Sequence, residues 1–254
     1  MQKHPLISIN LSIGPYPDFI REILDLTGAP GCSEYVCIAN AHMLTEAHYK
    51  QDFQKIVNQS IITTPDGVPL TWGLQLLYGI RQERVAGMDL LPDLLQAASS
   101  RRQPVFFYGG TEEMLRKVRQ HIEHCYPGIP DVGIYNPPFR PLSPQEEEFI
   151  INLIHAHRAK IVFVVLGCPK QERWMASMKG RIQAVMIGVG GALPVLLGMQ
   201  KRAPKWMQHQ GLEWLYRFLQ EPVRLWKRYL VTNSQFILLI LKAKFTGQKT
   251  KDKL

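Results

Sequence analysis

Cysteine is scarce in this sequence and follows no ligand pattern. The four cysteines (Cys32, Cys37, Cys125 and Cys168) form no C-x-x-C pair and no His/Cys group at zinc-binding spacing. Such a chain is typical of a reducing compartment, where disulfides are rare. We therefore expect a cytoplasmic environment and no metal site.

Long apolar runs are also missing. The N-terminal segment MQKHPLISINL has no extended apolar core followed by a small-residue cleavage site, so we expect no signal peptide. Near the other end, the longest apolar run is FILLIL at 236–241, far short of the roughly 20 residues that span a bilayer. We expect a chain that does not cross a membrane.

The common phosphate-binding motifs are incomplete or absent. The sequence has no Walker A motif, and its glycine loops YGGT and GVGGA lack the full dinucleotide-binding pattern. It also has no D-x-D sequence, which would hold a divalent cation against a diphosphate. A dinucleotide site is only weakly indicated, and we expect neither a cofactor nor a metal.

What is present begins with an uneven charge. The 254 residues are 46% hydrophobic and carry a net charge of +9, as a folded chain with a core can. Residues 201–254 hold 12 of the 30 Lys/Arg but only 3 of the 21 Asp/Glu, so the whole net charge lies there. This indicates an anionic partner: phospholipid head groups, a lipid pyrophosphate or nucleic acid. A solvated basic terminus is the alternative for the last eight residues, GQKTKDKL.

Strand-like runs alternate with helical patterns, which predicts βα units and a mainly parallel sheet flanked by helices. The predicted strands are Tyr35–Ala39, Ile61–Thr64, Val105–Tyr108, Val132–Tyr135, Ile161–Leu166 and Ala184–Val189. The predicted helices cover 17–28, 41–51, 67–79, 88–99, 112–124, 144–157, 170–179 and, with a break, 206–243. We expect an α/β body over 1–200 and a helical, basic appendage over 201–254.

Five loops follow predicted strands and contain small, polar or ionisable residues. In open parallel sheets ligands bind beyond the carboxyl ends of the strands, so these loops predict one composite pocket. The loop residues are Asn40, Asp66, Gly109 with Gly110, Lys170 with Gln171, and Gly190 with Gly191. The glycines have two interpretations: tight packing, or bare backbone amides that approach a phosphate.

Two charged side chains have competing interpretations. Asp66, in TTPDG, is either the N-cap of the following helix or a base that faces a cleft. Arg84 is either a surface arginine or a clamp for a phosphate, because an apolar run follows it.

The appendage has an amphipathic pattern. At 100° per residue, one face carries Leu212, Leu215, Leu219, Val223, Trp226 and Leu230. Arg217, Arg224 and Arg228 lie opposite, and Pro222 predicts a kink between the two halves. The pattern fits an interfacial membrane helix or, equally, a helix docked on the body with exposed arginines.

Six segments together resemble the WecG/TagA/CpsF family of bacterial glycosyltransferases. They are TPDGVPL, ERVAGMDLL, FFYGG, GCPKQERWM, GVGGAL and KRAPKWMQHQGLEWLYRFLQEPVRLWKRYL, in the family's order and spacing from about Tyr35 to Leu230. The resemblance implies a Rossmann-like body and a metal-independent, inverting enzyme. It would move N-acetylmannosamine, its uronic acid or glucose from a UDP-sugar to a polyprenyl-pyrophosphate-linked saccharide. It would act at the inner face of the cell membrane.

The resemblance also implies roles for particular residues. Asp66 matches the family's proposed catalytic base, and Asn40, Arg84 and Gln171 match other pocket residues. The basic appendage residues thought to close the site at the membrane match Arg217, Arg224, Lys227 and Arg228. Many members carry Thr two residues before Asn40, where this chain has Ile38, so a hydroxyl contact is lost or moved.

Two other classes of protein remain as alternatives. One is a nucleic-acid-binding protein that uses the basic tail as a clamp, although the neutral body argues against a nucleic-acid partner. The other is an inactive scaffold of a polysaccharide assembly complex. The sequence leaves the oligomeric state open; exposed apolar surface at the tail could support a homo-oligomer.

Overall fold

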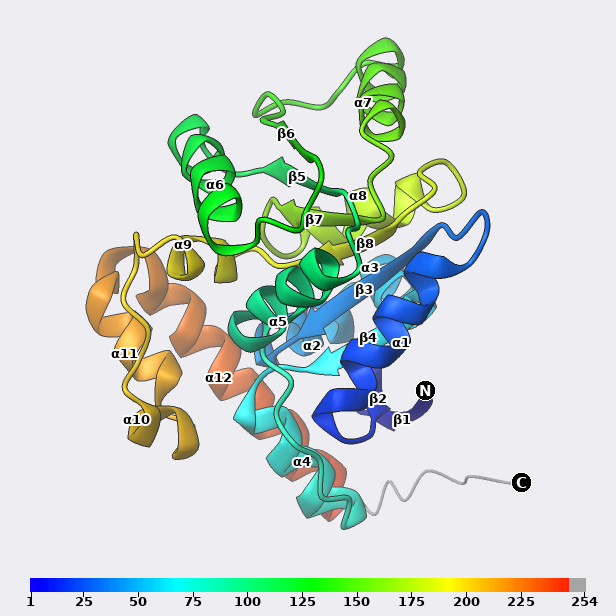
Figure 1. Cartoon of the computed structure of the whole chain (residues 1–254). Helices are drawn as coiled ribbons and strands as arrows, with labels where there is room; N and C mark the ends of the chain where they lie inside the picture. Colours follow the sequence, from blue (N-terminus) through cyan, green and yellow to red (C-terminus); the bar gives the residue numbers. More distant parts are fainter. Residues whose placement is uncertain (247–254) are drawn as a thin grey trace.

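The computed structural model describes residues 1–246, apart from the side chains of His209, Arg224, Lys227, Arg228 and Tyr229. The terminal segment GQKTKDKL lies outside the described residues, so its predicted exposure to solvent stays a prediction. Figure 1 shows the chain as a central sheet with helices on both of its faces.

The central sheet has six strands, and every neighbouring pair is parallel. All six predicted strands are confirmed to within two residues. The strands are β3 (Glu34–Ala39), β4 (Ile62–Pro65), β5 (Val105–Gly109), β6 (Val132–Tyr135), β7 (Ile161–Val165) and β8 (Val185–Gly188). Their order across the sheet is β4-β3-β8-β7-β5-β6. The predicted Rossmann-like α/β fold is therefore confirmed.

Each face of the sheet is buried under its own hydrophobic cluster, which explains why the strands read as nearly continuous apolar runs. Successive residues of β5 alternate between the two clusters. Phe106 and Tyr108 belong to one cluster, and Val105 and Phe107 belong to the other.

The helices of the body are α1 (Tyr16–Gly28), α2 (Ala41–Tyr49), α3 (Gln51–Gln59), α4 (Val68–Tyr78), α5 (Gly87–Ser100), α6 (Glu112–Cys125), α7 (Pro144–Ala156), α8 (Lys170–Met178) and α9 (Ala192–Leu196). Helices α3 and α9 are not predicted from the sequence, and the others lie where they are predicted. A capping box starts α7: the Ser143 hydroxyl accepts from the Glu146 amide, and the Glu146 carboxylate accepts from the Ser143 amide.

An N-terminal hairpin, not predicted from the sequence, precedes the main sheet. Strands β1 (Gln2–Leu6) and β2 (Ile9–Ile13) pair antiparallel and form a separate two-stranded sheet. The hairpin packs beside β4, where the Thr63 amide donates to the Ser12 hydroxyl over 3.1 Å. The hairpin thus helps to cover the edge of the main sheet.

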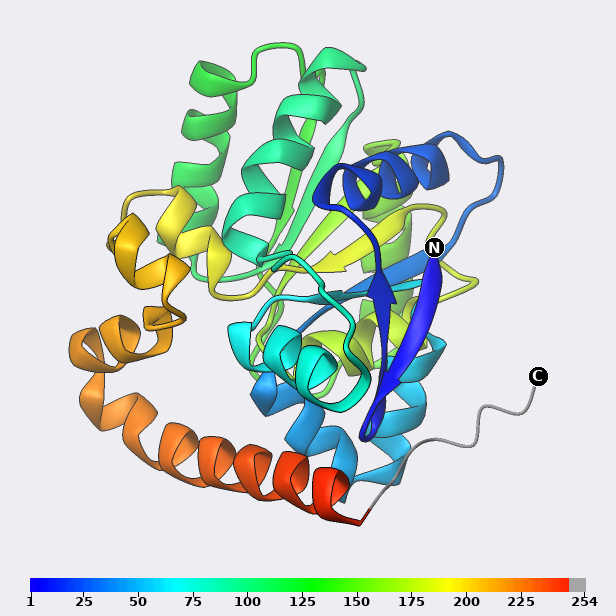
Figure 2. The ribbon, with the colours of Figure 1, turned by 90° about the horizontal axis from the view of Figure 1, so that it is seen from below.

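Beyond residue 200 the chain forms an arm of three helices, α10 (Lys205–His209), α11 (Glu213–Gln220) and α12 (Pro222–Phe245). The sequence predicts one interrupted helix with a kink at Pro222. Instead Pro222 is the first residue of α12, where its missing amide hydrogen is not needed. Figure 2 shows the arm wrapping around one side of the body. Phe236 and Ile240 of α12 are buried in the core cluster that also contains residues of α2 and α4.

Candidate functional site

The order of the strands places five loops in one row at the carboxyl edge of the sheet. The row begins with Asp66 after β4 and Asn40 after β3, followed by the glycine loop after β8. The loop after β7, which leads into Lys170 and Gln171, comes next, and Gly109 ends β5 beyond it. The five loops therefore lie along one edge of the sheet, and the first three follow neighbouring strands. A single composite pocket formed by all five stays a prediction.

Asp66 follows β4 directly, and its backbone amide donates to the Ala39 carbonyl of β3 over 2.8 Å. The N-cap of α4 is Gly67, and no described side chain caps that helix. The helix-cap interpretation of Asp66 is therefore wrong. The base interpretation of the Asp66 carboxyl group is the one that remains.

The surroundings of Asp66 favour the protonated carboxyl group. Burial raises the pKa of Asp66 to about 6. The positive charges of Arg84 and Arg217 pull this pKa down, whereas the negative charges of Glu213 and Asp89 add to the rise. A carboxyl group with a pKa near neutrality suits a general base, since it can both lose and accept a proton.

Asn40 caps α2 and lies beside Asp66. Its Oδ1 accepts from the amides of His42 and Met43, at 3.1 and 3.2 Å. The side-chain oxygen is thus engaged in the fold, and the amide NH2 is the part that can face a ligand. Two residues earlier, Ile38 is buried and packs against Gly87 of α5, in the second core cluster.

Arg84 lies in the connection between α4 and α5, with a side chain only 19% exposed. It forms an ion pair with Glu213 at the start of α11 and lies 3.5 Å from Asp89 of α5. Arg202 extends the network, because it pairs with Asp89 at 2.7 Å and lies 3.8 Å from Glu213. The surface-arginine interpretation of Arg84 is therefore wrong, and four alternating charges join the body to the arm.

Glu213, Arg202 and Asp89 were not identified from the sequence. One signal could have pointed to Glu213: it is one of only two acidic residues between 201 and 246, in a strongly basic segment. An isolated carboxylate in such a segment is a natural partner for arginine.

Arg217 of α11 lies against the glycine loop that follows β8. A Cβ atom added to Gly191 would stand 2.6 Å from Arg217 Nη2, so only glycine leaves room for the guanidinium there. Arg217 is one of the residues predicted to face the membrane, and in the structure it also lies at the edge that carries Asp66. The glycine at position 191 therefore serves a contact with the arm.

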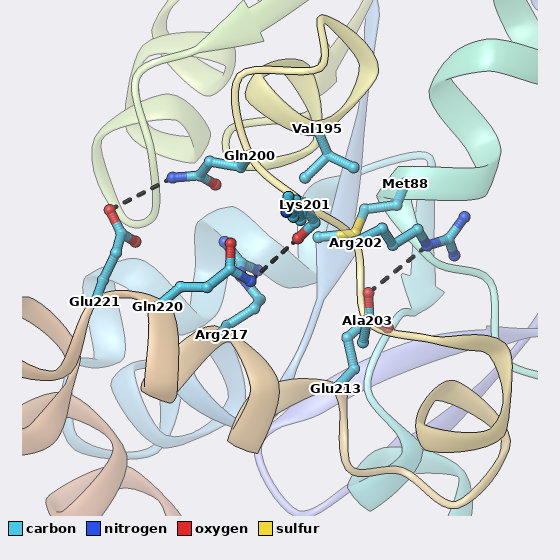
Figure 3. A pocket seen from close by; sticks show the side chains of 10 residues that line it. All are labelled: Met88, Val195, Gln200, Lys201, Arg202, Ala203, Glu213, Arg217, Gln220 and Glu221. Atoms are coloured by element: carbon cyan, nitrogen blue, oxygen red, sulfur yellow. Dashed lines mark hydrogen bonds and ion pairs between the residues drawn. The ribbon is translucent and has the colours of Figure 1, made fainter.

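The arm and the body enclose a small cavity, shown in Figure 3. Arg202, Glu213 and Arg217 line it together with seven other residues, and its volume is about 10 Å³, room for about one water molecule. Gln220 donates to the Lys201 carbonyl over 3.1 Å and holds α11 against this segment. Residues of the arm and of the body thus line this cavity together.

Gln171 is buried and its side-chain amide is fully engaged. Its Oε1 accepts from the Gly167 amide at 3.1 Å, while Nε2 donates to the Gly188 carbonyl and to Glu172. These bonds tie the loop after β7 to the end of β8. The structure therefore fits a positioning role for Gln171 beneath the loops.

The remaining glycines have local explanations. Gly109 has a φ of +96°, and a Cβ there would stand 2.8 Å from the Val165 carbonyl oxygen. Gly110 has a φ of +90°, which also favours glycine. Lys170 is exposed at the first turn of α8. A phosphate contact for these residues, and for Gly190, stays a prediction.

The predicted membrane-facing cations Arg224, Lys227 and Arg228 lie on α12, and their side chains are outside the described part of the structure. Among residues 1–246, no helix combines the length and apolarity needed to cross a bilayer. Within the same range, no three His, Cys, Asp or Glu side chains gather as a metal-binding group.

Comparisons with known proteins agree with the resemblance seen in the sequence. The model of the glycosyl transferase WecG/TagA/CpsF family matches residues 5–250. Three relatives share the name N-acetylglucosaminyldiphosphoundecaprenol N-acetyl-beta-D-mannosaminyltransferase. The Bacillus spizizenii protein is 28% identical over 243 residues, 95% of this chain and 92% of the relative. The Bacillus subtilis protein is 31% identical over 208 residues, which cover 82% of this chain and 78% of the relative. A Staphylococcus aureus protein is 29% identical over 220 residues, which cover 85% of this chain and 83% of the relative.

Proposed function

The chain belongs to the WecG/TagA/CpsF family of glycosyl transferases, and from this we propose that it transfers a sugar from a UDP-sugar to a polyprenyl-pyrophosphate-linked saccharide. The product would enter cell-surface polysaccharide biosynthesis. The names of the relatives favour N-acetylmannosamine as the sugar and N-acetylglucosaminyl-diphosphoundecaprenol as the acceptor. The uronic acid of N-acetylmannosamine and glucose remain the other candidates for the donor sugar.

Asp66 acts as the general base in this proposal. Its carboxylate takes the proton from the acceptor hydroxyl, whose oxygen attacks the anomeric carbon as the bond to the UDP oxygen breaks. Attack from the face opposite UDP inverts the anomeric centre. One observation carries the proposal: the Asp66 carboxyl group caps no helix, has a pKa of about 6 and lies near Arg84 at the carboxyl edge of the sheet.

Arg84, Arg217 and the backbone amides near Gly190 and Gly191 would stabilise the negative charge that grows on the β-phosphate. Glu213 forms an ion pair with Arg84. A donor diphosphate would therefore compete with the Glu213 carboxylate for this guanidinium. Glu213 still has Arg202 within 3.8 Å when that exchange occurs.

Peripheral attachment to the inner face of the cell membrane would bring this site to a lipid-linked acceptor. Leu219, Val223, Trp226 and Leu230 of the predicted apolar face are all exposed on α11 and α12. Side chains of this kind insert into the interface between head groups and acyl chains, and basic residues strengthen the attachment to anionic lipid. Arg224, Lys227 and Arg228 would supply that charge or bind the acceptor pyrophosphate.

The experiment is an assay of UDP release from a panel of UDP-sugars, with polyprenyl-pyrophosphate-linked N-acetylglucosamine as the acceptor and EDTA present. We expect release with one donor, and with UDP-N-acetylmannosamine first. No release from any donor, together with tight, salt-sensitive RNA binding, would favour a nucleic-acid-binding protein. No release without RNA binding would favour the scaffold.

A further inference from the structure

The apolar stripe on the arm is longer than the sequence analysis predicts. Large exposed apolar side chains run along α12: Val223, Trp226, Leu230, Val231, Ile237, Leu238, Leu241 and Phe245. At 100° per residue they fall within a sector about 140° wide. Leu225, Phe236 and Ile240 occupy a different sector and are buried against the body. The exposed stripe therefore continues to the end of the helix, well beyond Leu230.

Helix α4 of the body adds to this surface. Trp72 and Leu76, one helical turn apart, are 64% and 47% exposed, whereas Leu70 and Leu74 are fully buried. The two helices touch: a Cβ added to Gly73 would stand 3.0 Å from Ile240 Cδ1 of α12. Figure 1 shows the last turns of α12 directly behind α4. Two helices that contact each other thus both carry exposed apolar side chains, one on the arm and one on the body.

Exposed cations accompany the apolar side chains. Lys242 and Lys244 lie on the last turns of α12, and Arg81 follows the end of α4. A large exposed apolar surface on a folded chain marks a site of interaction. This combination suits a bilayer that contains anionic lipid. The acyl chains bury the apolar side chains, and the anionic head groups attract lysine and arginine.

We propose that α4 and the second half of α12 form a bilayer contact of their own, with an anionic phospholipid surface as the occupant. The contact would press the body, and not only the arm, against the membrane. Since α4 begins two residues after Asp66, the candidate base would be held at a fixed height above the lipid. That height matters only if the chain transfers sugar to a lipid-linked acceptor, as proposed above. The bilayer contact itself does not depend on the proposed function.

The test compares two double variants in vesicle sedimentation, with vesicles of phosphatidylcholine and phosphatidylglycerol and no sugar donor or acceptor. Trp72→Gln/Leu76→Gln should lower the partition coefficient about tenfold, because two apolar side chains no longer enter the bilayer. The control, Phe139→Gln/Phe149→Gln, removes side chains that are 97% and 56% exposed. Phe149 lies on α7, at the opposite end of the molecule from α4 (Figure 1), and partition should not change.

An unchanged partition coefficient in the α4 variant would overturn the proposal. So would a lipid-free dimer that the α4 variant dissociates, since a second copy of the chain would then cover this surface. Equal thermal midpoints would show that both variants are folded. Transfer to a short-chain, water-soluble acceptor should be the same in wild type and the α4 variant. Loss of lipid binding in a chain that transfers no sugar would refute the proposed function and leave the bilayer contact standing.

Discussion

Asp66 carries a carboxyl group whose ionisation works against the fold. Its pKa in the folded chain, about 6, lies above its ordinary value of 3.8. The stability that the protonated group contributes is therefore complete below 3.8 and is lost as the pH rises through 6. At pH 8 this difference corresponds to at most about 3 kcal/mol. The ionised Asp66 carboxylate, which the proposed reaction needs, thus lowers the free energy of unfolding.

Replacing Asp66 by Asn should stabilise the chain and inactivate it. The variant cannot ionise, so at pH 8 its free energy of unfolding should exceed that of wild type by about 1–3 kcal/mol, and the gap should shrink below pH 6. Transfer should fall by at least about a hundredfold, because the base is missing. Denaturation at pH 8 and pH 5 measures the first effect, with the exposed Asp25→Asn as the control. Near-normal turnover would rule out Asp66 as the base.

The pH dependence of transfer should report Asp66 and its neighbours. We expect kcat/KM to rise with pH and level off above about 6, as the carboxyl group loses its proton. Glu213→Gln should move this rise to lower pH, since the Glu213 charge raises the pKa of Asp66 and also occupies Arg84. The control is Glu221→Gln, the other acidic residue of the described arm. A profile that does not move in Glu213→Gln would contradict the coupling between these residues.

Among the secondary-structure elements, α11 contacts the glycine loop after β8 through Arg217. Gly191 has a right-handed helical conformation that alanine also adopts, so the backbone permits Gly191→Ala. The new methyl group would displace the Arg217 guanidinium, the end of a flexible side chain. We expect transfer to fall about tenfold or more, while thermal stability changes little. Gly28→Ala is the control, because a Cβ there meets nothing within 4 Å. Full activity in Gly191→Ala would show that the Arg217 contact is dispensable.

Two elements that are not predicted from the sequence, the β1–β2 hairpin and the short helix α9, have little periodicity of their own. They are held in place by contacts with distant parts of the chain, such as Ser12 with Thr63. Helix α3 differs, because its buried Phe53 and Val57 do have helical spacing. The arm divides into three helices because its segments dock on different surfaces. Local pattern does predict the strands and the Ser143 capping box, since those depend on neighbouring residues.

For the molecule as a whole, binding to vesicles should depend on salt as well as on apolar surface. The net charge of +9 belongs to residues 201–254, so anionic vesicles should bind the chain more tightly than neutral ones, and added salt should weaken that binding. Sedimentation at low and high salt measures this. Neutral vesicles should show little salt dependence. Equal binding to both kinds of vesicle would mean that the charge has no part in attachment.

Local sequence accounts for the parallel sheet, most helices, the row of loops that contains Asp66 and Asn40, and the apolar stripe of the arm. Each of these follows from periodicity, turn chemistry or the rule that ligands bind at the carboxyl ends of parallel strands. The folded chain adds the ion pair between Arg84 and Glu213, which are 129 residues apart, and the contact of Arg217 with Gly191. It also shows that Gln171 ties the loop after β7 to the end of β8, and that α4 and α12, which both carry exposed apolar side chains, are in contact. Such contacts depend on how the arm packs on the body, and no local pattern of residues encodes that packing.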